Sequence, residues 1–137
     1  MSFDAIYSTG ASAMRAQVMR LDTIASNLAN ANTVASSEND AYRAVKPVFE
    51  TVYQQTETSF SAQVNMAGVV QTDRPVDQRY EPNNPLSDAD GYVYYSNVNE
   101  LEEMADMMSA SRSFQTATSV LNRVSGMQQS ILSLGQR

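Results

Sequence analysis

Apolar residues recur at alternating spacings of three and four near both ends of this chain. In the N-terminal part the pattern runs from residue 3 to residue 31, and near the other end it runs from residue 107 to residue 134. This heptad spacing is typical of helices that pack together along one face. It predicts a helical unit at residues 1–32 and another at residues 97–137, paired as an antiparallel coiled coil.

The residues expected to form the packing faces define a predicted assembly seam. Gly10 lies within the first stripe, where it predicts either a frayed or kinked first part of the helix or a close contact with another backbone. In the second helix the stripe begins on Val98 and Leu101 and then moves to the register of Met107, a shift that resembles a stutter. The predicted seam comprises Phe3, Tyr7, Met14, Leu21, Ile24, Leu28, Leu101, Met104, Met108, Phe114, Leu121, Val124, Ile131 and Leu134.

The middle segment, residues 33–96, changes to a period of two. Residues 44–53 show the clearest alternation and are rich in strand formers, and Pro47 restricts this strand to a sheet edge or to a start after the proline. Weaker strand signals occur at 64–66, 69–72 and 79–81, and residues 92–95 predict a short aromatic strand. The sequence therefore predicts a mainly α-helical fold with a small β-rich middle, inserted like a hairpin between the terminal helices of one structural unit.

Composition excludes most familiar active sites. The 137 residues include no cysteine and no histidine, which removes thiol nucleophiles, disulfides and the common zinc sites. The net charge is −6, and the nine basic residues are scattered singly, which is untypical of a nucleic-acid-binding surface. We expect no enzymatic activity, no cofactor, no small-molecule substrate and no nucleic-acid partner.

Two acidic groups suggest chemistry on first inspection. Asp88 and Asp90 begin like a calcium-binding loop, but an EF-hand requires glycine at position 6 and glutamate at position 12, where this chain has Val93 and Asn99. The carboxylates after Asn99 could be paired as in an acidic glycosidase. They are better explained as residues that suit the positive end of the helix dipole.

The chain lacks signals for membrane insertion. No stretch approaches the roughly 20 apolar residues that cross a bilayer, so we expect a protein that is not membrane-inserted. The first ten residues contain Asp4 but no lysine or arginine, which is untypical of a cleavable secretory signal. Export, if it occurs, is expected to use another route.

Several motifs together resemble those of the axial rod proteins of the bacterial flagellum. The resemblance rests on the run from Ile24 to Thr33, the Asn97–Asn99 block, and the segments around Gly91 and Arg112. Relatives usually have proline where this chain has Ser96, so we expect a less rigid start to the second helix. The family-motif residues are Ser26, Asn27, Leu28, Ala29, Asn30, Thr33, Asn97, Val98, Asn99 and Arg112.

The resemblance implies a structural subunit of the proximal rod, the driveshaft of the flagellum, located in the periplasm. It implies assembly into a helix through the terminal helices, after type III export without a cleaved signal. The implied partners are further copies, other proximal and distal rod subunits, the rod-base adaptor and the export apparatus. The alternative is a soluble helical adaptor or export chaperone that binds a partner helix in a groove rich in methionine.

Overall fold

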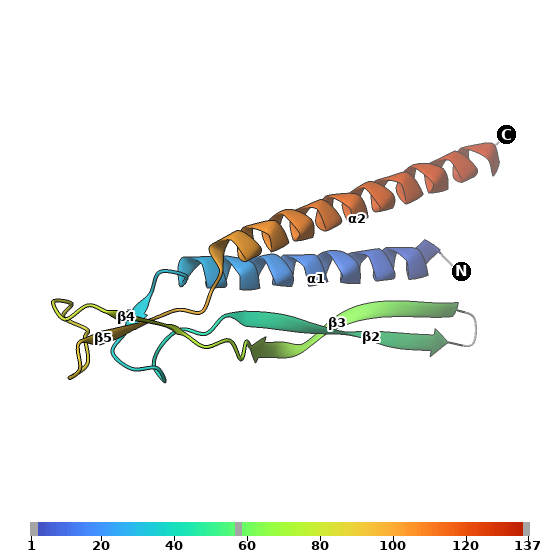
Figure 1. Ribbon diagram of the computed structural model, residues 1–137. Helices are drawn as coiled ribbons and strands as arrows, with labels where there is room; N and C mark the ends of the chain where they lie inside the picture. The colour runs from blue at the N-terminus through green and yellow to red at the C-terminus, as the bar shows by residue number, and fades with distance from the viewer. Residues whose placement is uncertain (1–2, 57–58, 136–137) are drawn as a thin grey trace.

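Two long antiparallel helices dominate the computed structural model, which describes residues 3–56 and 59–135. Helix α1 (Phe3–Ala29) has 27 residues and helix α2 (Glu100–Gly135) has 36, so about half of the chain is helical. The helices lie close together near the end of α1 and diverge toward the C-terminus of α2 (Figure 1). The predicted N-terminal and C-terminal helices and the predicted β-rich middle are confirmed. The pairing of the helices as a coiled coil stays a prediction.

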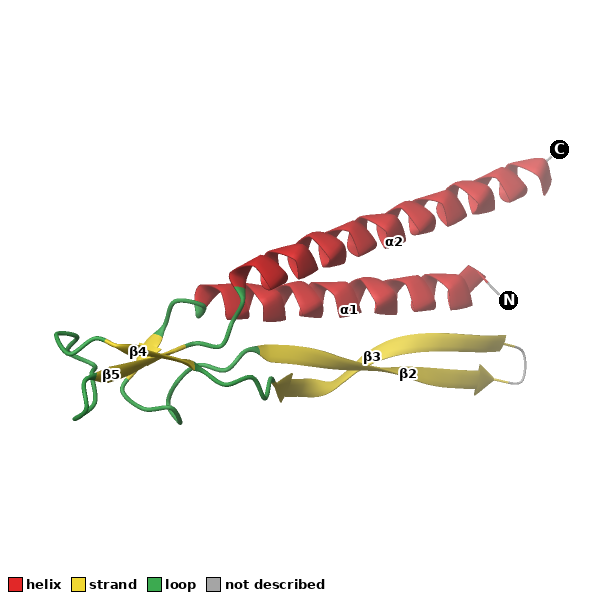
Figure 2. Cartoon of the chain, viewed as in Figure 1, coloured by secondary structure: helices red, strands yellow, loops and turns green. Residues whose placement is uncertain are grey.

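A long β-hairpin covers the side of α1 that faces away from α2. It consists of β2 (Val45–Thr56) and β3 (Ser59–Gln71), and both strands contact α1. Helix α1 is therefore the middle layer of a slender molecule, between α2 and the hairpin (Figure 2). Pro47 pairs with Val69 in this two-stranded sheet, in which every strand is an edge, as the proline predicts.

The hairpin is longer and more continuous than the sequence indicates. The two weak strand signals on either side of Gly68 belong to one strand, β3, and Gly68 pairs with Val48. The register shifts between Val48 and Phe49, where the partner strand accommodates Ala67 as an extra residue. A bulge of this kind lets pairing continue through a position where the alternation fails, which explains why the pattern suggested two short strands.

A second, smaller sheet closes the opposite end of the molecule. Its strand order is β1-β5-β4, with β1 (Val34–Ala35), β4 (Asp77–Tyr80) and β5 (Tyr92–Tyr95). Strand β5 coincides with the predicted aromatic strand, and its Val93 is fully buried. Strand β1 was not predicted, because two residues are too few to show a period.

Small side chains form most of the core in the described part of the chain. The buried apolar residues are mainly alanines, which allow close approach of the helices and the hairpin. Ile24 is the largest of the buried apolar side chains and is 3% exposed. The buried apolar residues are Ala5, Ala16, Ile24, Ala31, Ala41, Ala44, Val93 and Ala110. Neither α1 nor α2, over its described length, has the hydrophobicity that crossing a membrane requires.

Candidate assembly interface

Leu121 of α2 packs directly on the backbone of α1 at Gly10. A Cβ atom placed on Gly10 would lie 2.6 Å from Cδ2 of Leu121 and 3.0 Å from its Cγ, so the position has no room for a side chain in this arrangement. Nearby, the Tyr7 hydroxyl donates to Oε1 of Gln128 at 3.4 Å. A close contact between the helices at Gly10 is thus confirmed, with the Leu121 side chain rather than a second backbone as the neighbour.

Asn27 joins three elements where the helices meet. Its Nδ2 donates to the Val45 carbonyl at 2.8 Å and to Glu103 Oε2 at 3.1 Å. Its Oδ1 accepts from the Val45 amide at 3.0 Å and from the Tyr42 hydroxyl at 3.1 Å. Both Asn27 and Glu103 are buried, so this side chain ties α1 to the start of β2 and to α2 without contact with solvent.

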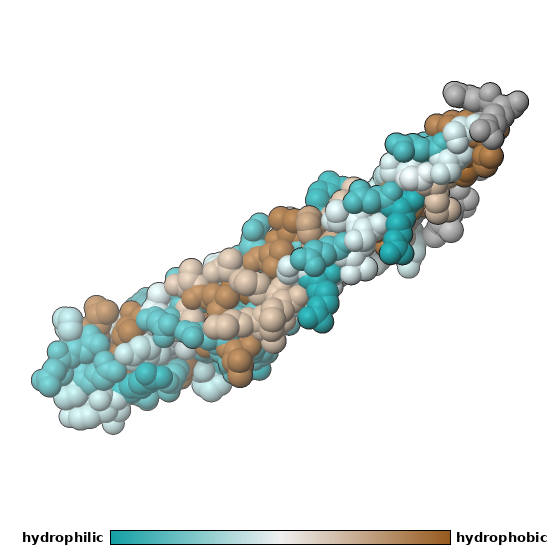
Figure 3. Space-filling model, turned by 90° about the horizontal axis from the view of Figure 1, so that it is seen from above, coloured by the Kyte–Doolittle hydropathy of each residue, from teal (hydrophilic) through white to brown (hydrophobic). Residues whose placement is uncertain are grey.

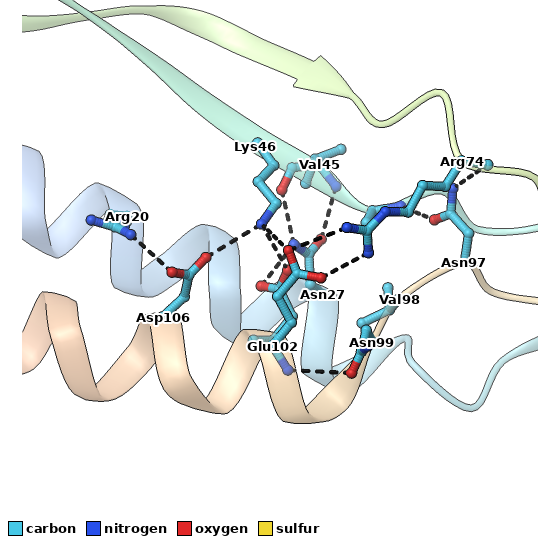
Figure 4. Close-up of polar contacts among 12 residues, drawn as sticks. Arg20, Asn27, Val45, Lys46, Arg74, Asn97, Val98, Asn99, Glu102 and Asp106 are labelled. Carbon is cyan, nitrogen blue, oxygen red and sulfur yellow. Dashed lines mark hydrogen bonds and ion pairs between the residues drawn. The ribbon is translucent and has the colours of Figure 1, made fainter.

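An ion-pair network surrounds this junction (Figure 4). The Lys46 ammonium lies 3.3 Å from Asp106 and within 3.6 Å of carboxylate oxygens of Glu102 and Glu103. Burial favours its neutral form, but the hydrogen bond to Asp106 and the three surrounding carboxylates raise the pKa of Lys46 above 10.5. One cation on β2 therefore offsets the repulsion among three acids of α2.

Two arginines extend the network outward. Arg20 of α1 pairs with Asp106 at 3.1 Å, and Arg74 pairs with Glu102 at 2.7 Å. The hydrogen bond from Arg74, followed by its charge and that of Lys46, lowers the pKa of Glu102 below 4.5. The acids expected to suit the helix dipole thus also hold α1, β2 and the segment after β3 against α2, a role that their local spacing does not reveal.

The residues before α2 fix its position. Asn99 Oδ1 accepts from the amides of Leu101 and Glu102 and caps the helix. Asn97 instead joins α2 to distant segments: its Nδ2 donates to the Thr72 and Arg74 carbonyls, at 3.3 and 2.7 Å, and its Oδ1 accepts from the Ala44 amide.

The buried Ser96 compensates for the missing proline with hydrogen bonds. Its amide donates to the Thr33 carbonyl at 3.3 Å, and its Oγ accepts from the Val98 amide at 3.1 Å. The expectation of a less rigid start to α2 omitted these bonds, the first of which a proline could not form.

The other family-motif residues have local roles or face solvent. Asn30 donates to the Ser26 carbonyl and Thr33 donates to the Asn30 carbonyl, which closes the end of α1. The Ser26 hydroxyl lies 3.3 Å from the hydroxyl of Tyr42. Leu28 and Val98 are half-buried, and Ala29 and Arg112 are exposed.

The predicted seam divides between two faces of α2. Positions in the register of Met107, from Met107 to Gln128, are buried or half-buried, as are the predicted seam residues of α1. Leu101 and Met108 are 77% and 63% exposed, and Met108 lies about 200° around the helix from the buried Ala110. The two registers are therefore separate stripes on different faces, and their interpretation as one shifting stripe is wrong.

The outer surface of α2 is apolar in two places. Leu101, Met104 and Met108 form an exposed stripe near its start, which we call the proximal stripe. A distal stripe lies on its C-terminal half, where Val120, Met127, Ile131 and Leu134 are each more than half exposed. Figure 3 views the molecule from the side of α2. It shows hydrophobic residues near the middle of the molecule and again toward the C-terminus. Exposed apolar side chains grouped in this way are a common feature of surfaces that bind another protein.

Asp88 organises a turn by accepting hydrogen bonds. Its Oδ1 accepts from the amides of Asp90 and Tyr92, and its Oδ2 accepts from the Tyr94 hydroxyl at 3.3 Å. Gly91 adopts a φ of 83°, which favours glycine, beside these contacts. These contacts make Asp88 the centre of a turn.

Comparison with known proteins agrees with these features. A family model described as flagella basal body rod protein matches residues 8–34, and one described as flagellar basal body rod FlgEFG protein C-terminal matches residues 89–134. All the family-motif residues lie within these two matches.

Several relatives that match over nearly the full chain share one name. The flagellar basal-body rod protein FlgC of Salmonella typhimurium is 42% identical over 131 residues, covering 96% of each chain. FlgC of Yersinia enterocolitica is 38% identical over 99% of this chain and 100% of its own, and FlgC of Bacillus subtilis is 27% identical over 94% and 95%. The chain therefore belongs to the FlgC family of flagellar basal-body rod proteins, structural proteins of the organelle of motility.

Proposed function

We propose that this protein is a subunit of the proximal rod that assembles into a helix by packing its α1–α2 pair against neighbouring subunits after type III export. The observation that carries this proposal is the outer surface of α2, where seven large apolar side chains of the two stripes are exposed. Membership in a family of rod proteins supports neighbouring subunits as the partners of these side chains. Burying these side chains between subunits would stabilise the assembled tube through the hydrophobic effect.

The predicted assembly seam then has two functions. Residues such as Tyr7 and Leu121 join the helices within one subunit and make α2 a stiff rod, because close packing resists deformation. Residues of the proximal and distal stripes contact other subunits. Because the two stripes differ, the contact between copies is heterologous, and such a contact extends into a helix instead of closing into a dimer.

We propose the partners and location that accompany this role. The neighbours are further copies, other proximal and distal rod subunits and the rod-base adaptor, within the periplasm. The export apparatus delivers the chain, and a protein without cysteine forms no disulfide on the way. Segments 1–32, 33–96 and 97–137 act as one assembling unit, because Asn27, Val45 and Glu103 link all three.

The rod function is tested in a strain whose chromosomal gene is deleted, restored or replaced by a variant. Deletion is expected to abolish motility, and the restored protein is expected in purified basal bodies at a fixed ratio to other rod proteins. Met108→Asp, on an exposed position, is expected to leave the soluble protein folded while removing it from basal bodies. Absence of the wild-type protein from purified rods, with export intact, would contradict a rod function and favour the adaptor or chaperone.

A further inference from the structure

Helix α2 carries its charges in two separate blocks. Its first part has four acids, Glu100, Glu102, Glu103 and Asp106, whereas positions 107–135 contain no acid and two arginines. Neither Arg112 nor Arg123 forms an ion pair with a described residue, and both are exposed. Arg123 lies within the distal stripe, because the positions 120, 123, 127, 131 and 134 follow a helical 3-4 spacing. The distal stripe is therefore apolar and positive.

The proximal stripe has the complementary character. Leu101, Met104 and Met108 are exposed beside Glu100, which is exposed and accepts a hydrogen bond from Asn32 but has no cationic partner among the described residues. The other acids of this part already pair with Lys46, Arg20 or Arg74. One carboxylate without an ion pair among the described residues and three exposed apolar side chains thus remain for an outside partner.

We infer that the distal stripe of one copy packs on the proximal stripe of the next, with the two α2 helices parallel and offset by 23 residues. This inference rests on the proposed rod function and names the surfaces that join two copies. At this offset Arg123 faces Glu100, Met127 faces Met104 and Ile131 faces Met108. These three pairs match, one by charge and two by hydrophobicity, whereas Leu134 faces Ser111 and Leu101 faces the half-buried Val124.

An antiparallel arrangement does not give these matches. If Met127 faces Met104 with the helices reversed, Arg123 faces Met108 and Glu100 faces Ile131, so each charge meets an apolar side chain. The parallel offset repeats from copy to copy and leaves a free stripe at each end.

Disulfide cross-linking in purified basal bodies tests this contact, because the natural chain has no cysteine. The double variant Met104→Cys, Met127→Cys places its thiols about 35 Å apart on one helix, beyond the roughly 7 Å between Cα atoms that a disulfide spans. Every disulfide must therefore join two copies. We expect a ladder of covalent multimers from the double variant and monomers from each single variant. A control pair, Met19→Cys with Met127→Cys, uses an exposed methionine of α1 and is expected to give no ladder.

The other outcomes separate the two proposals. Dimers from either single variant, or dimers without higher multimers from the double variant, overturn the parallel contact. Rods that contain the double variant but give no cross-link also overturn it, while the rod function stands. Absence of the wild-type protein from rods overturns the rod function itself.

Charge exchange gives a second readout that needs no cysteine. Arg123→Glu is expected to lower the amount in rods roughly fivefold, the factor an exposed ion pair can contribute. Adding Glu100→Arg is expected to restore it, whereas Arg15→Glu, an equal charge change on exposed α1 surface, is expected to have little effect. Failure of the exchanged pair to restore incorporation overturns the proposed register.

Discussion

Asn27 and Glu103, 76 positions apart in the chain, share a buried hydrogen bond of 3.1 Å. The asparagine amide uses both of its functions here, since Nδ2 donates to Glu103 and Val45 while Oδ1 accepts from Val45 and Tyr42. A carboxylate, a hydroxyl or an apolar side chain would leave at least one of these buried groups without a partner. The position therefore needs an amide of this size.

Asn27→Asp is expected to destabilise the folded chain by about 3 kcal/mol at neutral pH. The aspartate cannot donate to Val45, and it brings a second buried carboxylate against Glu103. Chemical unfolding followed by circular dichroism measures the loss. The control is Asn39→Asp in an exposed turn, for which we expect a change within about 0.5 kcal/mol. Equal effects of the two substitutions would show that the Asn27 contacts contribute little.

Gly10→Ala is expected to destabilise the fold although alanine is the better helix former. The gain in helix propensity is about 1 kcal/mol, but the added methyl group would displace Leu121 from α1. In a Leu121→Ala background the obstacle is gone, and the same substitution is expected to stabilise. Unfolding free energies of the four variants form a double-mutant cycle. An equal gain in both backgrounds would contradict the close contact.

The parts of the fold that local spacing controls could be predicted from the sequence. The heptad stripes predict both helices to within a few residues, and the alternation at 92–95 predicts β5 with its ends. The helix start at Asn99 is also predictable, because a cap acts on amides two and three positions away. In each case the residues that give the sequence pattern are the residues of the predicted element or lie within a few positions of it.

The features that join distant segments could not be predicted in this way. Asn27 lies in a run of asparagines that favours the end of a helix, and nothing local shows that it binds Val45 and Glu103. The stripe of Leu101 and Met108 has the same spacing as the one that packs on α1, so period alone does not tell which face α1 covers. Those choices depend on contacts across the molecule.

Acid is expected to weaken the junction through Glu102. The hydrogen bond from Arg74, then its charge and that of Lys46, lower the folded-state pKa of this carboxyl below 4.5. A lowered pKa means that the ionised form stabilises the fold; its contribution is complete above pH 4.5 and disappears as the pH falls through the folded-state value. We expect Glu102→Gln to flatten the fall of Tm below pH 4.5, and the exposed Glu50→Gln to leave it unchanged. Identical acid profiles for both variants would contradict this role.

Leu121→Asp is expected to abolish incorporation into rods while the protein stays soluble. An ionised carboxylate at this half-buried position has no partner against Gly10, so the α1–α2 pair should lose about 2 to 3 kcal/mol. Motility and the content of purified basal bodies measure the effect. Asn122→Asp introduces a carboxylate one position away on exposed surface. This variant is expected to keep both motility and the normal amount of protein in basal bodies. Normal motility with Leu121→Asp alone would count against the paired helices as the unit of assembly.

The last two turns of α2 are expected to become ordered by assembly. Residues 129–135 are all exposed, and α2 diverges from α1 toward its C-terminus (Figure 1). Their amides are expected to exchange rapidly in the dilute protein, because opening these exposed turns uncovers little buried surface, whereas amides near Ala110 exchange slowly. In rods the same C-terminal peptides should gain strong protection as Ile131 and Leu134 are buried by a neighbour. Hydrogen exchange with mass spectrometry compares the two states, and equal protection of these peptides in both would show that the end of α2 is ordered without a partner.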